Sequence, residues 1–87
     1  MKHKDDFILR EIAGEYVIIP VGESAAIHSG IIELSETSAF VWKLLDNPCT
    51  IDELVAAVTE EYEVSSEEAR DDILKLINSL NQLDALE

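Results

Sequence analysis

The chain has 87 residues, of which 47% are hydrophobic and 29% charged, and its formal net charge is −13. This length accommodates one modest hydrophobic core, so we expect a single domain over residues 1–87. The composition excludes a disordered tail and a collagen-like chain, and no apolar run approaches the roughly 20 residues that span a bilayer.

The N-terminal part is expected to form a β-hairpin. Its first residues, MKHKDDF, include basic side chains but no apolar segment behind them, so we expect no secretory signal and a cytosolic location. Residues 7–12 (FILREI) and 16–19 (YVII) favour strands, and AGE at 13–15 supplies the glycine of a tight turn. Pro20 ends the second strand.

A third strand follows this hairpin. We expect the segment 23–34 to begin as a loop or bulge with a kink at Ser29-Gly30 and to end as a strand at 31–34. This segment has few charges and neither lysine nor proline, the residues that usually protect the edge of a sheet. If the strand lies at an edge, it is suited to accept an extended peptide as a further strand.

The rest of the chain reads as three helices. Ser35 fits the N-cap of a helix that runs to about Asp46, and this helix is apolar on more than one side. We therefore expect it to lie between the sheet and later helices. Thr50 and Glu53 form a capping-box pattern at the start of the second helix, and SSEE at 65–68 repeats the pattern at the start of a third, which ends near Leu83.

The order of these elements predicts an α+β fold. We expect a three-stranded antiparallel sheet followed by three helices (βββααα). On a helical wheel the third helix has a clear core face. That face consists of Ala69, Ile73, Leu76, Ile77, Leu80 and Leu83.

One flank of the third helix does not fit this simple pattern. Leu74 lies outside the core face, on the same side as Arg70, Asn78 and Asn81. Leu74 could pack against a neighbouring strand or helix. Alternatively, one apolar side chain among directional hydrogen-bonding groups could form the wall of a peptide-docking site.

Composition and spacing argue against several kinds of chemistry. Twelve acidic and two basic residues follow Leu45, which is the wrong sign for binding nucleic acid. The acidic surface indicates either solubility or attraction to a basic partner. The single cysteine, Cys49, cannot form an internal disulfide, and His3 and His28 have no metal-ligand spacing. We expect Cys49 to be a small buried side chain and the protein not to be an enzyme.

Motifs along most of the chain resemble the PqqD family of RiPP-recognition domains, which serve peptide-modifying enzymes. IIELSETSAFVWKLLDNPCTIDELVAAVTEEYEV and ILKLINSLNQLDALE follow the family's order of an apolar strand and three helices, and FILREIAGEYVIIPVGE is similar to its opening hairpin. Ser35 stands where the family usually has asparagine and preserves the capping chemistry, and Ser38 stands where glycine or alanine is frequent. The matching positions are Leu34, Thr37, Ala39, Trp42, Leu44, Leu45, Thr50, Glu53, Leu54, Tyr62, Leu80 and Leu83.

This resemblance implies a winged helix-turn-helix-like domain, a binding module that performs no chemistry and needs no cofactor. Relatives hold the leader segment of a ribosomally synthesised precursor peptide as an added strand, on the third strand and against the third helix. They present it to a modifying enzyme, often a radical S-adenosylmethionine enzyme. Glu33 or Arg70 would pair with charges of the leader. The expected peptide-binding residues are Ile31, Glu33, Arg70, Leu74, Ile77, Asn78 and Asn81.

Two other functions compete with peptide binding. The open strand and groove could pair with a second copy of the chain, which would make the protein a structural or regulatory homodimer. A winged-helix domain could also bind DNA through its third helix, but the acidic residues at 67, 68, 71 and 72 would repel phosphates.

Overall fold

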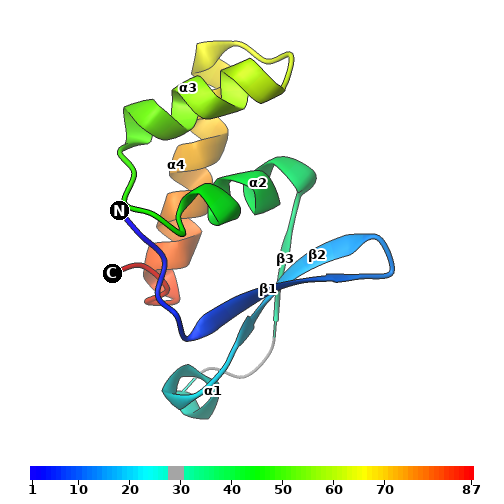
Figure 1. Ribbon diagram of the computed structural model, residues 1–87, viewed down its shortest axis with the longest axis vertical. Coiled ribbons are helices and arrows are strands. Elements are labelled where there is room, and N and C mark those ends of the chain that lie inside the picture. The colour runs from blue at the N-terminus through cyan, green and yellow to red at the C-terminus, as the bar shows by residue number, and fades with distance from the viewer. Residues whose placement is uncertain (28–30) are drawn as a thin grey trace.

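The computed structural model describes residues 1–27 and 31–87, and it has an α+β fold with a three-stranded antiparallel sheet (Figure 1). This confirms the predicted fold class. Figure 1 places α2, α3 and α4 at one end of the molecule and α1 at the other. The elements in chain order are β1 (Phe7–Ile12), β2 (Glu15–Pro20), α1 (Glu23–Ile27), β3 (Ile32–Leu34), α2 (Glu36–Leu44), α3 (Ile51–Glu61) and α4 (Ser66–Gln82).

The short helix α1 differs from the prediction, which placed a loop or bulge here. Its residues include glutamate and two alanines, which favour helix, and Gly22 adopts a positive φ of 61° directly before it. The hydroxyl of Ser24 donates a hydrogen bond to Asp6 Oδ2 at 3.3 Å, which ties α1 to the start of β1. The predicted kink at Ser29-Gly30 lies outside the described residues.

The hairpin of β1 and β2 confirms the strand prediction. Its turn residues Ala13 and Gly14 have φ values of 54° and 82°, as a two-residue type I′ turn requires. Glycine adopts this conformation freely, whereas it costs alanine about 1–2 kcal/mol. The register runs from Phe7 opposite Pro20 to Ile12 opposite Glu15, so the turn fixes which side chains face the helices.

The two faces of the sheet have different surroundings. Phe7 and Ile18 belong to the main hydrophobic core with the helices. Side chains alternate along a strand, so Val17 points to the opposite face from Ile18. Val17 is 4% exposed but does not belong to the main core. The face that includes Phe7 and Ile18 therefore fixes the sheet on the helices.

The three long helices begin at the predicted caps. The Ser35 hydroxyl accepts the Ser38 N–H at 3.1 Å and starts α2 directly after β3. At α3 the Thr50 hydroxyl accepts the Glu53 N–H at 3.1 Å, and the Glu53 carboxylate accepts the Thr50 N–H at 2.9 Å. This confirms the predicted capping box. At α4 the Ser65 hydroxyl accepts the N–H of Glu68, so the backbone half of the second predicted box is present.

Helix α2 lies between the sheet and the other helices, as predicted from its broad apolar surface. It contacts β3, α3 and α4, and both Val41 and Trp42 are almost completely buried. The predicted core face of α4 is also confirmed, with Leu83 packing at its margin. The buried residues that the three helices contribute are Ala39, Val41, Trp42, Leu54, Val55, Val58, Ala69, Ile73, Leu76, Ile77 and Leu80.

The two ends of the chain lie next to each other beside α2 (Figure 1). His3 forms an antiparallel bridge with Leu86, and its ring stacks on Trp42 at a centroid distance of 4.3 Å and an angle of 7°. One ring nitrogen of His3 contacts the Lys4 carbonyl oxygen at 3.0 Å, and the other contacts the Asp46 carboxylate. The N-terminal segment therefore covers Trp42 and closes one side of the core.

Replacing Thr50 by alanine is expected to lower the free energy of unfolding by about 1 kcal/mol, because the first turn of α3 loses its side-chain acceptor. The measurement is urea denaturation followed by circular dichroism. Thr59→Ala is the matched control, since within residues 1–27 and 31–87 the Thr59 hydroxyl bonds only to carbonyls of its own helix. The better helix propensity of alanine should keep that control within about 0.5 kcal/mol of the parent. Equal losses in the two variants would contradict the role of the capping box.

Replacing His3 by alanine is expected to lower the free energy of unfolding by about 1–2 kcal/mol, because the stack on Trp42 and the ring's polar contacts are lost. His3→Phe keeps a ring over Trp42 without the nitrogens, so it should recover part of the loss. Urea denaturation followed by the fluorescence of Trp42, the single tryptophan, measures both. If the two variants lose the same free energy, the stack does not contribute.

Candidate functional site

Strand β3 lies at the edge of the sheet. The strand order is β1-β2-β3, and β3 pairs antiparallel with β2 through Ile32 opposite Ile18, Glu33 opposite Val17 and Leu34 opposite Tyr16. Within residues 1–27 and 31–87 no strand pairs with its other side. The N–H and C=O groups on that side are therefore available to another chain, as the sequence suggested.

A groove of about 570 Å³ lies between this free edge and α4. We call it the β3 groove. Ser35 ends β3 and caps α2, and this cap brings the first turn of α2 to one end of the groove. Its lining residues are Glu33, Leu34, Ser35, Thr37, Ser38, Asp72, Lys75, Leu76 and Ser79.

The lining of the β3 groove combines an apolar floor with a polar rim. Leu34 is half-buried and Leu76 is buried, so the floor is continuous with the core. Ser79 and Asp72 are exposed on α4. Lys75 Nζ lies 3.0 Å from Asp71 Oδ2, and this hydrogen bond and the charge of Asp71 raise the pKa of Lys75 above its ordinary value. Such a lining suits a polypeptide, which offers both apolar side chains and hydrogen-bonding groups.

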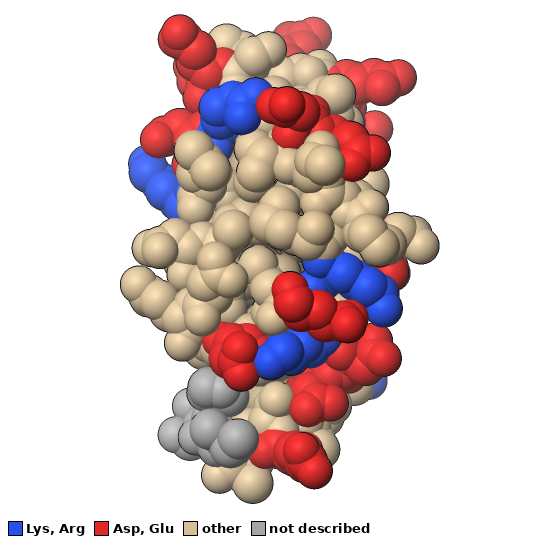
Figure 2. Space-filling view, turned by 90° about the vertical axis from the view of Figure 1, so that its left-hand side faces the viewer, with Lys and Arg blue, Asp and Glu red and all other residues tan. Residues whose placement is uncertain are grey.

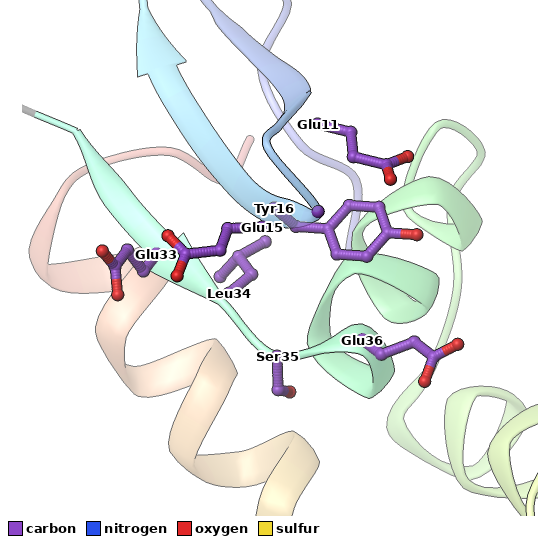
Figure 3. Close-up of a pocket in the computed structure, with 8 residues that line it drawn as sticks. Glu11, Glu15, Tyr16, Glu33, Leu34, Ser35 and Glu36 are labelled. Atoms are coloured by element: carbon purple, nitrogen blue, oxygen red, sulfur yellow. The ribbon is translucent and has the colours of Figure 1, made fainter.

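A second cavity, of about 590 Å³, lies at the turn end of the hairpin and borders the same strand (Figure 3). We call it the hairpin cavity. In Figure 3 the Tyr16 ring extends from β2 between Glu11 and Glu36. The two cavities share residues 33–35, so both open along β3. The residues that line the hairpin cavity are Glu11, Gly14, Glu15, Tyr16, Glu33, Leu34, Ser35 and Glu36.

The structure places two of the predicted site residues at β3. Glu33 lines both cavities, and Ile31 is 55% exposed just before the strand. Ile77 is 8% exposed and belongs to the hydrophobic core. Its side chain therefore packs inside the core, and a bound peptide would not reach it without displacing other core side chains.

The other four predicted residues share one flank of α4 that does not line the β3 groove. Leu74 is 49% exposed, and Arg70 Nη2 lies 2.6 Å from Asp52 Oδ1 of α3. At 100° per residue, Leu74 lies about 150° from the middle of the groove-facing set, which consists of residues 72, 75, 76 and 79. Asn78 and Asn81 are exposed beside Leu74. A binding role for this flank stays a prediction, and any partner there would be separate from the β3 groove.

The groove-facing residues of α4 carried a weaker signal in the sequence. The core face of α4 has a flank on each side, and a helical wheel treats the two flanks alike. Lys75 and Ser79 interrupt a largely acidic surface and mark the flank that turns toward β3. Only the position of the sheet distinguishes that flank from the one with Leu74.

The described residues contain neither a metal-binding cluster nor a membrane-spanning helix. No group of three or more His, Cys, Asp or Glu side chains in residues 1–27 and 31–87 is placed to hold a metal ion. No helix in this part of the chain is long and apolar enough to cross a membrane.

The surface of α4 is rich in acidic side chains, as the sequence indicated. Glu67, Glu68, Asp71 and Asp72 are all exposed on this helix, and basic side chains on the face in Figure 2 lie beside acidic ones. Four of the six lysines and arginines form ion pairs with acidic partners. This distribution does not favour the DNA-binding alternative, because a duplex would meet negative charge on α4.

Two solved structures are similar: one described as TbiB1 in complex with the TbiA(β) leader peptide and one as lasso peptide synthetase B1 complexed with the leader peptide. The first has a TM-score of 0.76 at 23% identity and covers 100% of this chain and 95% of its own. The second has a TM-score of 0.71 at 22% identity and covers 93% and 89%. At these identities the likeness establishes the fold.

A comparison with curated proteins found no match. The family model described as coenzyme PQQ synthesis protein D (PqqD) matches residues 8–86. This match includes all of the sheet except Phe7, the four helices and both cavities beside β3. The chain belongs to the PqqD family.

Proposed function

We propose that this protein is a non-catalytic peptide-binding module, a recognition element for the leader segment of a ribosomally synthesised precursor peptide. The observation that carries the proposal is the free edge of β3 beside a groove that α4 closes on the far side. Membership of the PqqD family supports it, and both similar solved structures are described as complexes with leader peptides.

Strand addition is the mode of binding that this geometry favours. The leader would run along β3 and extend the sheet to four strands, with its backbone bonded to the free N–H and C=O groups. Alternate side chains would point onto the floor formed by Leu34 and Leu76, and the others toward solvent. The hydroxyls of Thr37, Ser38 and Ser79 could bond to polar groups of the leader at the rim.

The partner enzyme belongs to the same proposal. A module that only binds a leader must deliver it to an enzyme that modifies the rest of the precursor, and we propose a radical S-adenosylmethionine enzyme or another peptide-modifying enzyme. A cytosolic location, expected from the sequence, fits such a partnership. A homodimer formed through the β3 edge is the competing use of this surface, and sedimentation at micromolar concentration with and without peptide distinguishes the two.

Titration with the leader of the precursor peptide encoded nearest to this protein's gene is expected to perturb two segments together. Amide resonances of residues 31–38 should shift because the edge of β3 gains hydrogen bonds, and those of residues 72–79 should shift because α4 forms the opposite wall. Heteronuclear NMR of the labelled protein is the measurement. Shifts confined to other regions, or none with any peptide from that gene neighbourhood, would count against the proposal.

Variants on the two flanks of α4 are expected to show which flank binds the leader: the one that lines the β3 groove, or the one with Leu74 that was predicted from the sequence. Ser79→Arg places a long side chain in the β3 groove and should weaken leader binding at least tenfold, because filling the groove displaces the peptide. Leu74→Asp, on the other flank, should change affinity less than twofold. Both positions are exposed, so neither variant disturbs the core. Calorimetric titration measures both affinities, and the reverse order would favour the Leu74 flank.

A further inference from the structure

The face of the sheet that points away from the core is unusually apolar, and we call it the outer face. An antiparallel sheet with one face on a core normally carries polar side chains on the other. Because side chains alternate along a strand, the outer face holds the residues that point in the same direction as Val17. In the described parts of the chain, none of its aliphatic side chains belongs to the main hydrophobic core. These are Ile8, Ile12, Val17, Ile19 and Ile31, and the charged residues among them are Arg10, Glu15 and Glu33.

Two of these isoleucines are largely exposed. Ile12 is 54% exposed at the turn end of the hairpin, and Ile31 is 55% exposed directly before β3. Among the described residues, the other large hydrophobic side chain that is exposed is Leu74 of α4. An apolar surface with a few charges is typical of a contact with another protein, so the outer face is a candidate interaction surface.

The charges of the outer face form an ordered row across the three strands. Arg10 of β1 lies opposite Val17 of β2, and Val17 lies opposite Glu33 of β3. A positive and a negative side chain therefore flank an apolar one, each one strand away. Both charged residues are exposed, and within residues 1–27 and 31–87 neither forms an ion pair. Both are available to a partner.

This row is complementary to itself. A twofold axis that runs parallel to β2 above Val17 exchanges β1 and β3, so it places Arg10 of each copy over Glu33 of the other. The same axis places Ile31 of one copy near Ile8 of the other. A twofold axis across the strands would instead place each charged residue over its own counterpart, which is repulsive. The charges thus favour a second copy of the chain as the partner, in one orientation.

We propose that two copies of this chain associate through their outer faces as a weak symmetric dimer. Three strands of up to six residues give a footprint of about 20 Å by 14 Å on each copy, far below the roughly 800 Å² of a stable interface. Association therefore takes place at concentrations on the order of 100 μM.

The β3 edge and the β3 groove stay free on both copies, because neither lies on the outer face. The dimer differs in this respect from one formed through the β3 edge. It goes beyond the proposed function and does not depend on it.

The test is an exchange of charges between two variant chains. Arg10→Glu makes both charges of the row acidic and Glu33→Arg makes both basic, so each variant alone should dimerise at least about tenfold more weakly than the parent. An equimolar mixture should form a heterodimer about as strongly as the parent, because every acidic residue of the row then faces a basic one. Both positions are exposed, so neither variant disturbs the core.

Sedimentation equilibrium from about 10 μM to 1 mM protein covers the expected range of association. The net charge of −13 opposes association, so the salt is kept at about 0.15 M, which screens charges more than about 8 Å apart. Glu15 lies on β2 beneath the proposed axis and would face its own counterpart. Glu15→Gln should therefore strengthen the dimer, which a general gain or loss of charge elsewhere on the surface would not explain.

The matched controls are Lys75→Glu and Glu60→Arg, which make the same changes of charge at exposed positions on α4 and α3. Each should leave the dissociation constant within about twofold of the parent. A parent that stays monomeric throughout, or variants whose mixture does not regain association, would overturn the inference. So would controls that weaken the dimer equally, or a dimer that the leader peptide dissociates by occupying the β3 edge. Amide shifts at residues 31–38 in the leader titration report on the proposed function separately, so either proposal can fail alone.

Discussion

The hydrogen-bonding groups on the free side of β3 are the constraint around which the rest of the site is arranged. A backbone edge in water readily pairs with another strand, and proteins usually protect it with charge, proline or a covering element. Here the edge is flanked by two cavities instead, one beside α4 and one at the end of the hairpin. The surroundings of the edge therefore restrict which polypeptide can pair with it.

The position of this edge depends on Ser35, where β3 ends and α2 begins. Ser35 caps α2, and the burial of Trp42 holds α2 in place. His3 covers Trp42 from the N-terminal segment. The groove wall and the core thus share the same elements, so a change that loosens α2 would also alter the space available along β3.

Sequence reasoning predicted most of the fold because the governing signals are local. The hairpin follows from AGE between two runs of strand-favouring residues. The starts of the three long helices follow from Ser35, Thr50 and Ser65, whose hydroxyls accept backbone N–H groups. The short helix α1 was missed because five residues give too little periodicity to distinguish a helix from a loop.

The candidate site was predicted less completely because it depends on non-local packing. The role of β3 as an edge could be suggested from its lack of lysine and proline, and Glu33 was placed in the site. The side of α4 that faces β3 could not be chosen, since a wheel fixes the direction of the core and leaves both flanks equivalent. The sequence predicted a docking wall on the flank with the apolar residue Leu74, which is exposed. The flank that lines the groove instead includes Lys75 and Ser79.

The shortness of β3 has a kinetic consequence. Three residues offer only a few backbone hydrogen bonds to an incoming chain, and each contributes modestly in water. Differences in affinity between related complexes are expressed mostly in the rate of dissociation. A polypeptide held only by so brief a ladder would dissociate quickly, so one copy of the domain could release one occupant and then accept another.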